Sequence, residues 1–147
     1  HHSLLHWEDS KPTTKTSMVT KKAATTVLLA TAQVKVRAAS GEYITLRALI
    51  DQGSQITTIS EEASQILALP RVRNSTEIHG LGGNIVGISK SKVNLIIKPR
   101  YLSNNTIKSQ ALVLSDLTSP QPDNSFNIDL NQWDNYVLAD PMFNKSF

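Results

Sequence analysis

Two adjoining segments of this chain alternate apolar and polar side chains with a period of two. The apolar residues are Leu28, Ala30, Ala32, Val34 and Val36 in the first segment, and Ile44, Leu46, Ala48 and Ile50 in the second. This period is typical of a strand with one face in the core, and residues 39–42 between the segments have the composition of a hairpin turn. The pattern therefore predicts two antiparallel strands at residues 28–37 and 43–50.

The remainder of the pattern also favours short strands, with one interruption. A third strand is predicted at residues 56–59, and two more at residues 92–98 and 107–114. Ser60 is a favourable N-cap and Pro70 cannot continue a helix, so about two helical turns are predicted between them. The apolar stripe of that helix consists of Ala63, Ile66 and Leu67. We therefore expect an all-β fold with one short helix.

Composition limits the classes of protein that fit. The chain has 147 residues, which suits one domain, and it has no cysteine, which excludes a disulfide framework and thiolate metal sites. It contains no apolar run long enough to span a bilayer and no signal-peptide pattern. We expect an intracellular, cytoplasmic protein without a membrane partner. Because the first residue is not Met, we also expect a piece of a longer polypeptide.

The net charge of +3 does not indicate a nucleic-acid-binding surface, because much of it lies at the N-terminal end. Residues 1–22 contain four of the 15 basic residues and two of the 12 acidic ones, which leaves +1 for the rest of the chain. A nearly neutral surface does not make a phosphate-binding footprint, so a nucleic-acid partner is not expected. We interpret residues 1–23 as a basic, Ser/Thr-rich disordered linker.

Histidines are common metal ligands, and three of them lie in this linker. His1, His2 and His6 have no cysteine nearby and no helical frame to hold them together, so free surface histidines are the favoured interpretation. We therefore expect neither a metal site nor a cofactor.

One carboxylate stands out at the end of the second predicted strand. Leu49 and Ile50 lead directly into Asp51, and Gly53 opens a turn behind it. A buried acid behind an apolar run needs hydrogen-bond donors, and the nearest are the amides of Gly53 and Ser54 and the Ser54 hydroxyl. Such an arrangement is typical of a catalytic carboxylate. An ordinary Asp-Gln-Gly turn is the alternative.

A second informative stretch is rich in glycine. Gly80, Gly82 and Gly83 lie close together and free the backbone from the usual steric limits, which favours a mobile hairpin tip that another chain can approach. The third glycine of a dinucleotide-binding loop would fall on Ile85, so that function is excluded. A plain hairpin and a hairpin that closes over a ligand both remain open.

These blocks together resemble the retropepsin-like aspartic proteases. The signature of that family is two aliphatic residues, Asp, Ser or Thr, Gly, and Ala or Ser, and the segment from Leu49 to Ser54 matches it everywhere except at Gln52. More narrowly, the chain resembles the protease region of BEL/Pao-type LTR retrotransposon polyproteins. The resemblance covers nearly the whole chain, residues 24–143. It is carried by four blocks in the same order, at residues 27–32, 48–56, 78–83 and 138–141.

The resemblance implies a fold, a reaction and a site. It implies a retropepsin-like single-lobe barrel with its core at residues 24–118, and an aspartic endopeptidase that cleaves its own polyprotein with Asp51 as the catalytic residue. Gln52, Gly53 and Ser54 would support the active-site loop. The flap, a hairpin that closes over bound peptide, would comprise His79, Gly80, Leu81, Gly82, Gly83 and Asn84.

The number of suitable acids predicts the assembly. Peptide hydrolysis by carboxylates requires one acid to take a proton from water and another to polarise the scissile carbonyl. Asp51 is the one suitable acid, because the later aspartates are not followed by x-Gly. Those are Asp116, Asp123, Asp129, Asp134 and Asp140. We therefore predict a two-fold homodimer in which two copies of Asp51 meet on the axis.

Two alternatives to an active protease stay open. Gln52 replaces the hydroxyl residue that locks the two active-site loops together in the family, which favours a catalytically inactive peptide-binding or assembly module. The basic N-terminal segment favours an RNA-associated segment of a polyprotein.

The C-terminal segment is expected to be loop-rich and incomplete. Residues 119–147 lose the strand periodicity and contain no aliphatic-aliphatic-Gly segment of the kind that completes the fold in the family. The residues predicted to dock this segment on the core are Trp133, Tyr136, Val137 and Leu138. We expect a chain shortened in this way to associate weakly and to have little activity alone.

Overall fold

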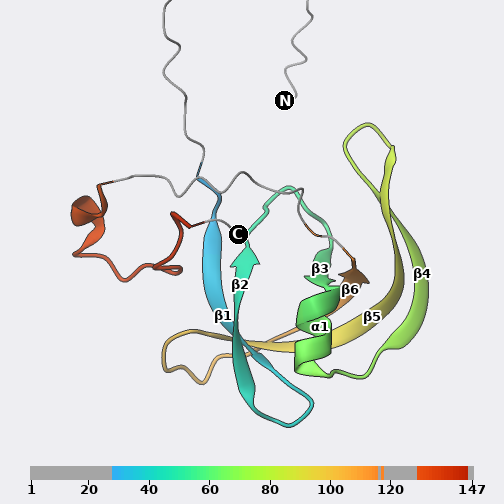
Figure 1. Ribbon diagram of the computed structural model, residues 1–147, viewed down its shortest axis with the longest axis horizontal. Coiled ribbons are helices and arrows are strands. Elements are labelled where there is room, and N and C mark those ends of the chain that lie inside the picture. The colour runs from blue at the N-terminus through green and yellow to red at the C-terminus, as the bar shows by residue number, and fades with distance from the viewer. Residues whose placement is uncertain (1–27, 116, 118–128, 146–147) are drawn as a thin grey trace, which may run out of the picture.

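The computed structural model describes residues 28–115, 117 and 129–145. This part of the chain forms one six-stranded sheet with one short α-helix and one 3₁₀ turn (Figure 1). The expectation of a mainly β fold with a single short helix is therefore confirmed. The linker predicted at residues 1–23 lies outside the described residues.

The first two strands form the predicted hairpin. β1 (Thr31–Arg37) and β2 (Tyr43–Leu49) pair antiparallel along their whole length. Their turn closes through a hydrogen bond from the Gly41 amide to the Ala38 carbonyl (2.9 Å). Gly41 has a φ of 93°, a conformation that favours glycine and explains why this residue is suited to the turn.

The predicted inward face of this hairpin is only partly correct. Val36 is buried, and Ile44 and Leu46 pack against the core. Ile50, in contrast, is 51% exposed, because β2 ends at Leu49 and Ile50 lies beyond the last strand pair. The end of this hairpin is therefore held by main-chain pairing more than by apolar packing.

The other four strands complete an open sheet. They are β3 (Thr57–Ser60), β4 (Val72–His79), β5 (Ile85–Pro99) and β6 (Ile107–Leu114). The strand order is β2-β1-β5-β6-β3, with β4 paired to β5, and only the β3–β6 pair is parallel. β6 has the predicted bounds, whereas β5 is much longer than predicted because it pairs with β1, β4 and β6 along its length. The retropepsin-like barrel stays a prediction.

The helix packs through a narrower face than predicted. α1 (Glu61–Leu67) begins where expected, since the Ser60 side chain accepts a hydrogen bond from the amide three residues later (3.1 Å). Leu67 and Ser64 are buried, but Ile66 is 54% exposed, so the prediction that Ile66 faces the core is wrong. In a helix of two turns, residues three apart suffice to cover the sheet. Among the described residues no helix is long and apolar enough to cross a membrane.

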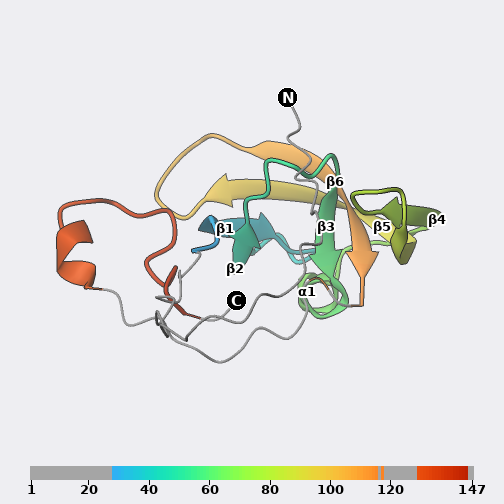
Figure 2. The same ribbon diagram turned by 90° about the horizontal axis from the view of Figure 1, so that it is seen from above.

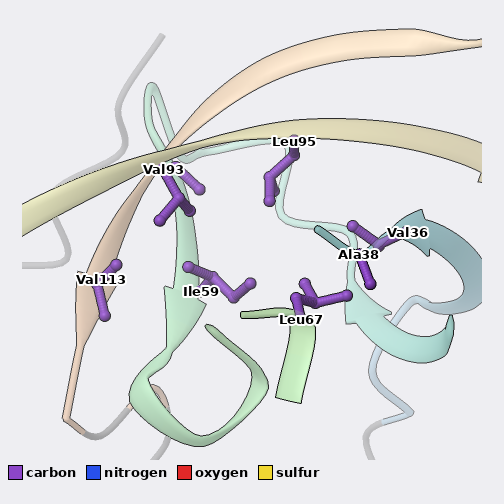
Figure 3. Packing of buried hydrophobic residues seen from close by; sticks show 8 residues of the cluster. Val36, Ala38, Ile59, Leu67, Val93, Leu95 and Val113 are labelled. Carbon is purple, nitrogen blue, oxygen red and sulfur yellow. The ribbon is translucent and has the colours of Figure 1, made fainter. Parts of the chain in front are cut away.

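The core lies between this helix and the sheet. Its buried hydrophobic residues are Val36, Ala38, Ile59, Leu67, Val93, Leu95, Ala111 and Val113. Figure 3 shows Leu67 of α1 between Ile59 of β3 and Ala38, which follows β1. The core therefore ties together the strands near α1. The loops at the opposite end of the strands carry the residues considered next.

Candidate functional site

The turn after β2 holds Asp51 through main-chain groups. The last bond of the β1–β2 pair runs from the Ile50 amide to the Ala30 carbonyl (2.7 Å). The Gly53 amide then donates to the Asp51 carboxylate, Oδ1, at 2.9 Å. The Ser54 amide donates to the Asp51 main-chain carbonyl at 3.3 Å. This tight turn orients the carboxylate through one of its oxygens, Oδ1.

Only one of the three donors predicted for this carboxylate contacts it. The Gly53 amide does so, whereas the Ser54 hydroxyl donates to the Ile56 carbonyl (2.8 Å) instead. A Cβ at Gly53 would lie 3.3 Å from Asp51 Oδ1, so glycine permits this close approach. Asp51 is exposed, and the prediction of a buried acid is wrong for the single chain because its turn extends beyond the sheet.

Apolar side chains surround this exposed acid in the sequence. Leu49 and Ile50 precede it and Ile56 follows it, and all three are exposed. Gln52, the residue that departs from the family signature, is exposed as well. The segment on either side of the Asp51 turn therefore carries exposed apolar side chains as well as the exposed carboxylate.

The glycine-rich stretch forms the predicted hairpin. β4 and β5 are joined by a tight connection in which the Gly80 amide donates to the Asn84 carbonyl (2.9 Å) and the Gly83 amide donates to the Gly80 carbonyl (3.1 Å). Gly82 and Gly83 have φ values of 92° and 80°, which side-chain-bearing residues rarely adopt. The glycines are thus required by the geometry of the tip. Its role as a flap stays a prediction.

The two side chains at this tip that were singled out are both exposed. Leu81 projects fully into solvent. His79 is the last residue of β4, and its Nδ1 atom lies 3.1 Å from the Gly83 carbonyl, across the hairpin. His79 Nε2 lies 3.5 Å from the Glu77 carboxylate. Through these contacts His79 stabilises the hairpin tip.

The Asp51 turn and the hairpin tip lie at the same end of the molecule. Figure 1 shows the β2–β3 loop and the β4–β5 tip on the side of the sheet away from α1, and Figure 2 shows the same loop and tip from above. β2 and β3 are at opposite ends of the strand order, so residues 50–56 cross from one outer strand to the other. The topology therefore places at one end of the molecule the two blocks that the sequence marked separately.

A second aspartate is buried, and sequence reasoning did not identify its role. The Asp140 side chain is fully excluded from solvent. Its Oδ2 atom accepts hydrogen bonds from Thr31 Oγ1 (2.6 Å) and Arg47 Nε (2.7 Å), and its Oδ1 atom accepts one from the Met142 amide (2.9 Å). Arg47 also donates to the carbonyl groups of Met142 (2.9 Å) and Lys145 (3.2 Å). We call Asp140, Arg47 and Thr31 the Asp140 clamp.

The C-terminal segment therefore docks by polar contacts. Trp133, Tyr136 and Val137 are exposed, so the prediction that these residues dock the segment on the core is wrong. Besides the clamp, Arg100 donates to the Leu138 carbonyl (2.8 Å). The signal available in the sequence was Arg47 itself, a cation within a strand, which needs an acidic partner when partly buried.

The clamp changes the acidity of its carboxyl group. Burial raises the pKa of Asp140, but the hydrogen bonds from Thr31, Arg47 and the Met142 amide, together with the Arg47 charge, outweigh burial. The pKa of Asp140 therefore lies below its usual value. Asp140 is therefore ionised near neutral pH and forms an ion pair with Arg47.

Two further described acids make contacts of their own. Glu61 pairs with Arg71 at 2.6 Å, and Asp129 accepts a hydrogen bond at the start of the 3₁₀ turn (Leu130–Trp133). Within residues 28–115, 117 and 129–145, no cluster of three His, Asp or Glu residues is placed to hold a metal ion.

Comparisons of the chain with protein-family models, with curated proteins and with solved structures found no match.

Proposed function

We propose that this chain is the aspartic endopeptidase of a retrotransposon polyprotein and that Asp51 is its catalytic acid. The observation that carries the proposal is the placement of Asp51. It is exposed, it is bound by one main-chain donor, and it lies at the same end of the molecule as the glycine-rich tip. No cation within the described part of the chain pairs with this acid. Its carboxylate is therefore available for chemistry.

The surroundings suit an extended peptide substrate. A peptide lying between the Asp51 turn and the tip would form strand-like hydrogen bonds to main-chain groups, which is how many proteins hold extended chains. The exposed side chains of Leu49, Ile50 and Ile56 would contact the apolar residues of such a peptide. Closure of the tip would exclude water from the scissile bond, and Gly82 and Gly83 give that tip its backbone freedom.

The proposed mechanism uses two copies of Asp51 that share one proton. The ionised carboxylate takes a proton from water as the water oxygen attacks the carbonyl carbon, while the protonated carboxyl donates to the carbonyl oxygen. The tetrahedral intermediate, a geminal diol, then collapses: the C–N bond breaks, the departing amine takes the proton that water gave to the first carboxyl group, and one hydroxyl of the diol returns its proton to the second carboxylate. Each acid thus returns to its starting state.

A homodimer follows from this mechanism. Two other described acids have cationic partners of their own, Asp140 with Arg47 and Glu61 with Arg71. A second chain related by a two-fold axis would supply the missing carboxylate. The proposed active form is therefore a dimer, with one active site on its axis.

A linked dimer tests this proposal directly. Two copies of the chain joined by a flexible linker of about 20 Gly and Ser residues raise the effective concentration of the second copy into the millimolar range. We expect this protein to cleave unfolded polypeptides, with the products identified by mass spectrometry. Asp51→Asn in one copy alone should lower cleavage by about a hundredfold or more, because a dyad with one acid loses its general acid–base pair.

The matched control is Asp134→Asn in one copy, since Asp134 is also an exposed aspartate. A linked dimer that loses only half its activity on Asp51→Asn would contradict the dyad. Unchanged cleavage would remove Asp51 from the mechanism altogether.

Gln52 favours a second candidate, an inactive peptide-binding module with the same fold. This residue follows Asp51 at the position where the retropepsin-like signature has Ser or Thr, and it is exposed. The linked dimer would then bind unfolded peptides without cleaving them, and binding would survive Asp51→Asn. Gln52→Ser separates the two candidates further, since only a site poised for hydrolysis should gain activity from the hydroxyl group.

A further inference from the structure

The end of β2 that presents Asp51 has few restraints of its own. β2 is an outer strand, and among the described strands it pairs with β1 alone. The bond from the Ile50 amide to the Ala30 carbonyl is the last link of this pair before the turn. Leu49 and Ile50 are exposed, so apolar packing does not anchor them. A side-chain contact that joins β1 to β2 here would therefore add to main-chain pairing alone.

The Asp140 clamp lies at this end of the hairpin. In the β1–β2 register Thr31 is opposite Leu49 and Gln33 is opposite Arg47, which makes Thr31 and Arg47 diagonal neighbours on adjacent strands. One oxygen of Asp140 accepts hydrogen bonds from both, at 2.6 Å and 2.7 Å. A single buried atom therefore joins β1 to β2 next to the last main-chain bond.

The clamp arrives from a segment that extends the sheet. β5 ends at Pro99, which pairs with Val34, so the first residues of β1 have no β5 neighbour. The Gln33 amide instead donates to the Ala139 carbonyl (2.8 Å). This bond places Asp140 beside Thr31, and it explains how a distant segment reaches the hairpin. Figure 1 shows the C-terminal segment beside the start of β1 and the end of β2.

From this geometry we infer that Asp140 is a positioning residue for Asp51. Asp140 acts through Arg47 and Thr31, which it holds together, and so fixes the strand end from which the Asp51 turn projects. The inference rests on the proposed role of Asp51, but its structural step can be tested without activity.

The test is an NMR measurement on the full chain with Asp140→Asn. This substitution keeps the size of the side chain but removes the charge that binds Arg47. We expect the order parameter of the Gly53 amide to fall from a rigid value of about 0.85 to below about 0.6, because the turn loses its anchor. The chemical shifts of the Asp51 carboxyl carbon and the Ser54 amide should also change. The order parameters and chemical shifts of the β5 and β6 amides near Val93 should stay as in the wild type.

A second variant protects the test against loss of folding. Thr31→Val removes one donor and leaves the Arg47–Asp140 ion pair, so a smaller change in the same direction is expected at Gly53. Glu61→Gln, which alters an exposed ion pair on α1, should change neither the Gly53 order parameter nor the chemical shift of the Asp51 carboxyl carbon. If Asp140 only held the C-terminal segment, Asp140→Asn would change only the signals of that segment, such as that of the Met142 amide. That result would overturn the inference.

Failure of this inference and failure of the proposed function give different results. A rigid Gly53 amide in Asp140→Asn, with the Met142 amide displaced, would reject positioning and leave the protease proposal standing. Cleavage by a linked dimer that is insensitive to Asp51→Asn would reject the proposed function while the effect of Asp140 on the turn could still be observed.

Discussion

Asp51 and Asp140 follow similar apolar residues in the sequence and stand in turns, yet their surroundings differ. Asp51 is exposed and accepts one hydrogen bond, from Gly53 two residues later. Asp140 is buried and accepts three, from Thr31, Arg47 and Met142. One carboxylate is bound locally, and the other joins three distant parts of the chain.

This difference separates a group that is free to react from a group that stabilises the fold. A buried carboxylate with a cationic partner cannot gain a proton without losing that partner, so Asp140 is unsuited to proton transfer. An exposed carboxylate contributes little to stability and costs little to change. The proposed function gives the chemistry to Asp51, whereas the contacts of Asp140 give it a structural role, and the following measurements test that division.

The largest expected effect is on folding stability. Asp140→Ala should lower the free energy of unfolding by about 3 kcal/mol or more, because it leaves Arg47 partly buried without its carboxylate. Asp51→Ala should change it by less than about 0.5 kcal/mol, as exposed substitutions usually do. Urea unfolding of both variants measures the difference. Equal losses would mean that the two aspartates do not divide their roles in this way.

A smaller loss is expected from the hydroxyl donor of the clamp. Thr31→Val keeps the shape and strand preference of the side chain but removes its hydrogen bond to Asp140. Because hydrogen bonds to charged groups are strong, the free energy of unfolding should fall by about 1.5 kcal/mol. Thr45→Val is the matched control, since Thr45 is exposed on β2. If both variants lose the same stability, the hydroxyl contact to Asp140 contributes nothing specific.

The pH dependence of stability should differ more modestly between wild type and Asp140→Asn. The pKa of Asp140 in the folded chain lies below the usual value of 3.8, because the hydrogen bonds and the Arg47 charge outweigh burial. Its contribution is therefore complete above the pKa of the unfolded chain and is lost as pH falls toward the folded value. Urea unfolding between about pH 5 and about pH 2.5 should show a steeper loss for wild type.

The other acid with a lowered pKa does not disturb this comparison. The hydrogen bond from Arg71 lowers the pKa of Glu61, which is present in both proteins, so its effect cancels in the difference. Parallel pH profiles for wild type and Asp140→Asn would show that ionisation of Asp140 does not stabilise the fold.

The smallest expected effect on stability is at the Asp51 turn. Gly53→Ala places a Cβ 3.3 Å from Asp51 Oδ1 and should displace the carboxylate while changing the free energy of unfolding by less than about 0.5 kcal/mol. Gly87→Ala is the control, because its Cβ would meet only ordinary contacts, the nearest at 3.9 Å. A shift of the Asp51 carboxyl resonance in the first variant and not in the second would show that glycine sets the local geometry.

Local features of the chain were predictable because local chemistry decides them. The period-two alternation located the β1–β2 hairpin, and β6 has the predicted bounds. The hydroxyl group of Ser60 marked the start of α1, and the clustered glycines marked the β4–β5 tip. In each of these elements the deciding interactions lie within a few residues, so the pattern contains the information.

The extent of β5 and the docking of the C-terminal segment were not predictable in the same way. β5 is long because three other strands pair with it, and its first half has no clear alternation of apolar and polar residues in the sequence. The C-terminal segment was expected to dock through Trp133, whereas Asp140 does so through a contact with Arg47 across 93 residues. A single polar pair over that distance has no periodicity, and several acids in the sequence were equally possible partners.

The sequence by itself determined a mainly β chain with one capped helix, a glycine hairpin and an aspartate behind an apolar strand, because those properties arise from neighbouring residues. Only the tertiary structure decided which aspartate is buried, which is exposed, and that the exposed one shares an end of the molecule with the hairpin tip. Burial and proximity depend on how distant strands pair, and the pairing of β1 with both β2 and the Asp140 segment is set by the whole fold.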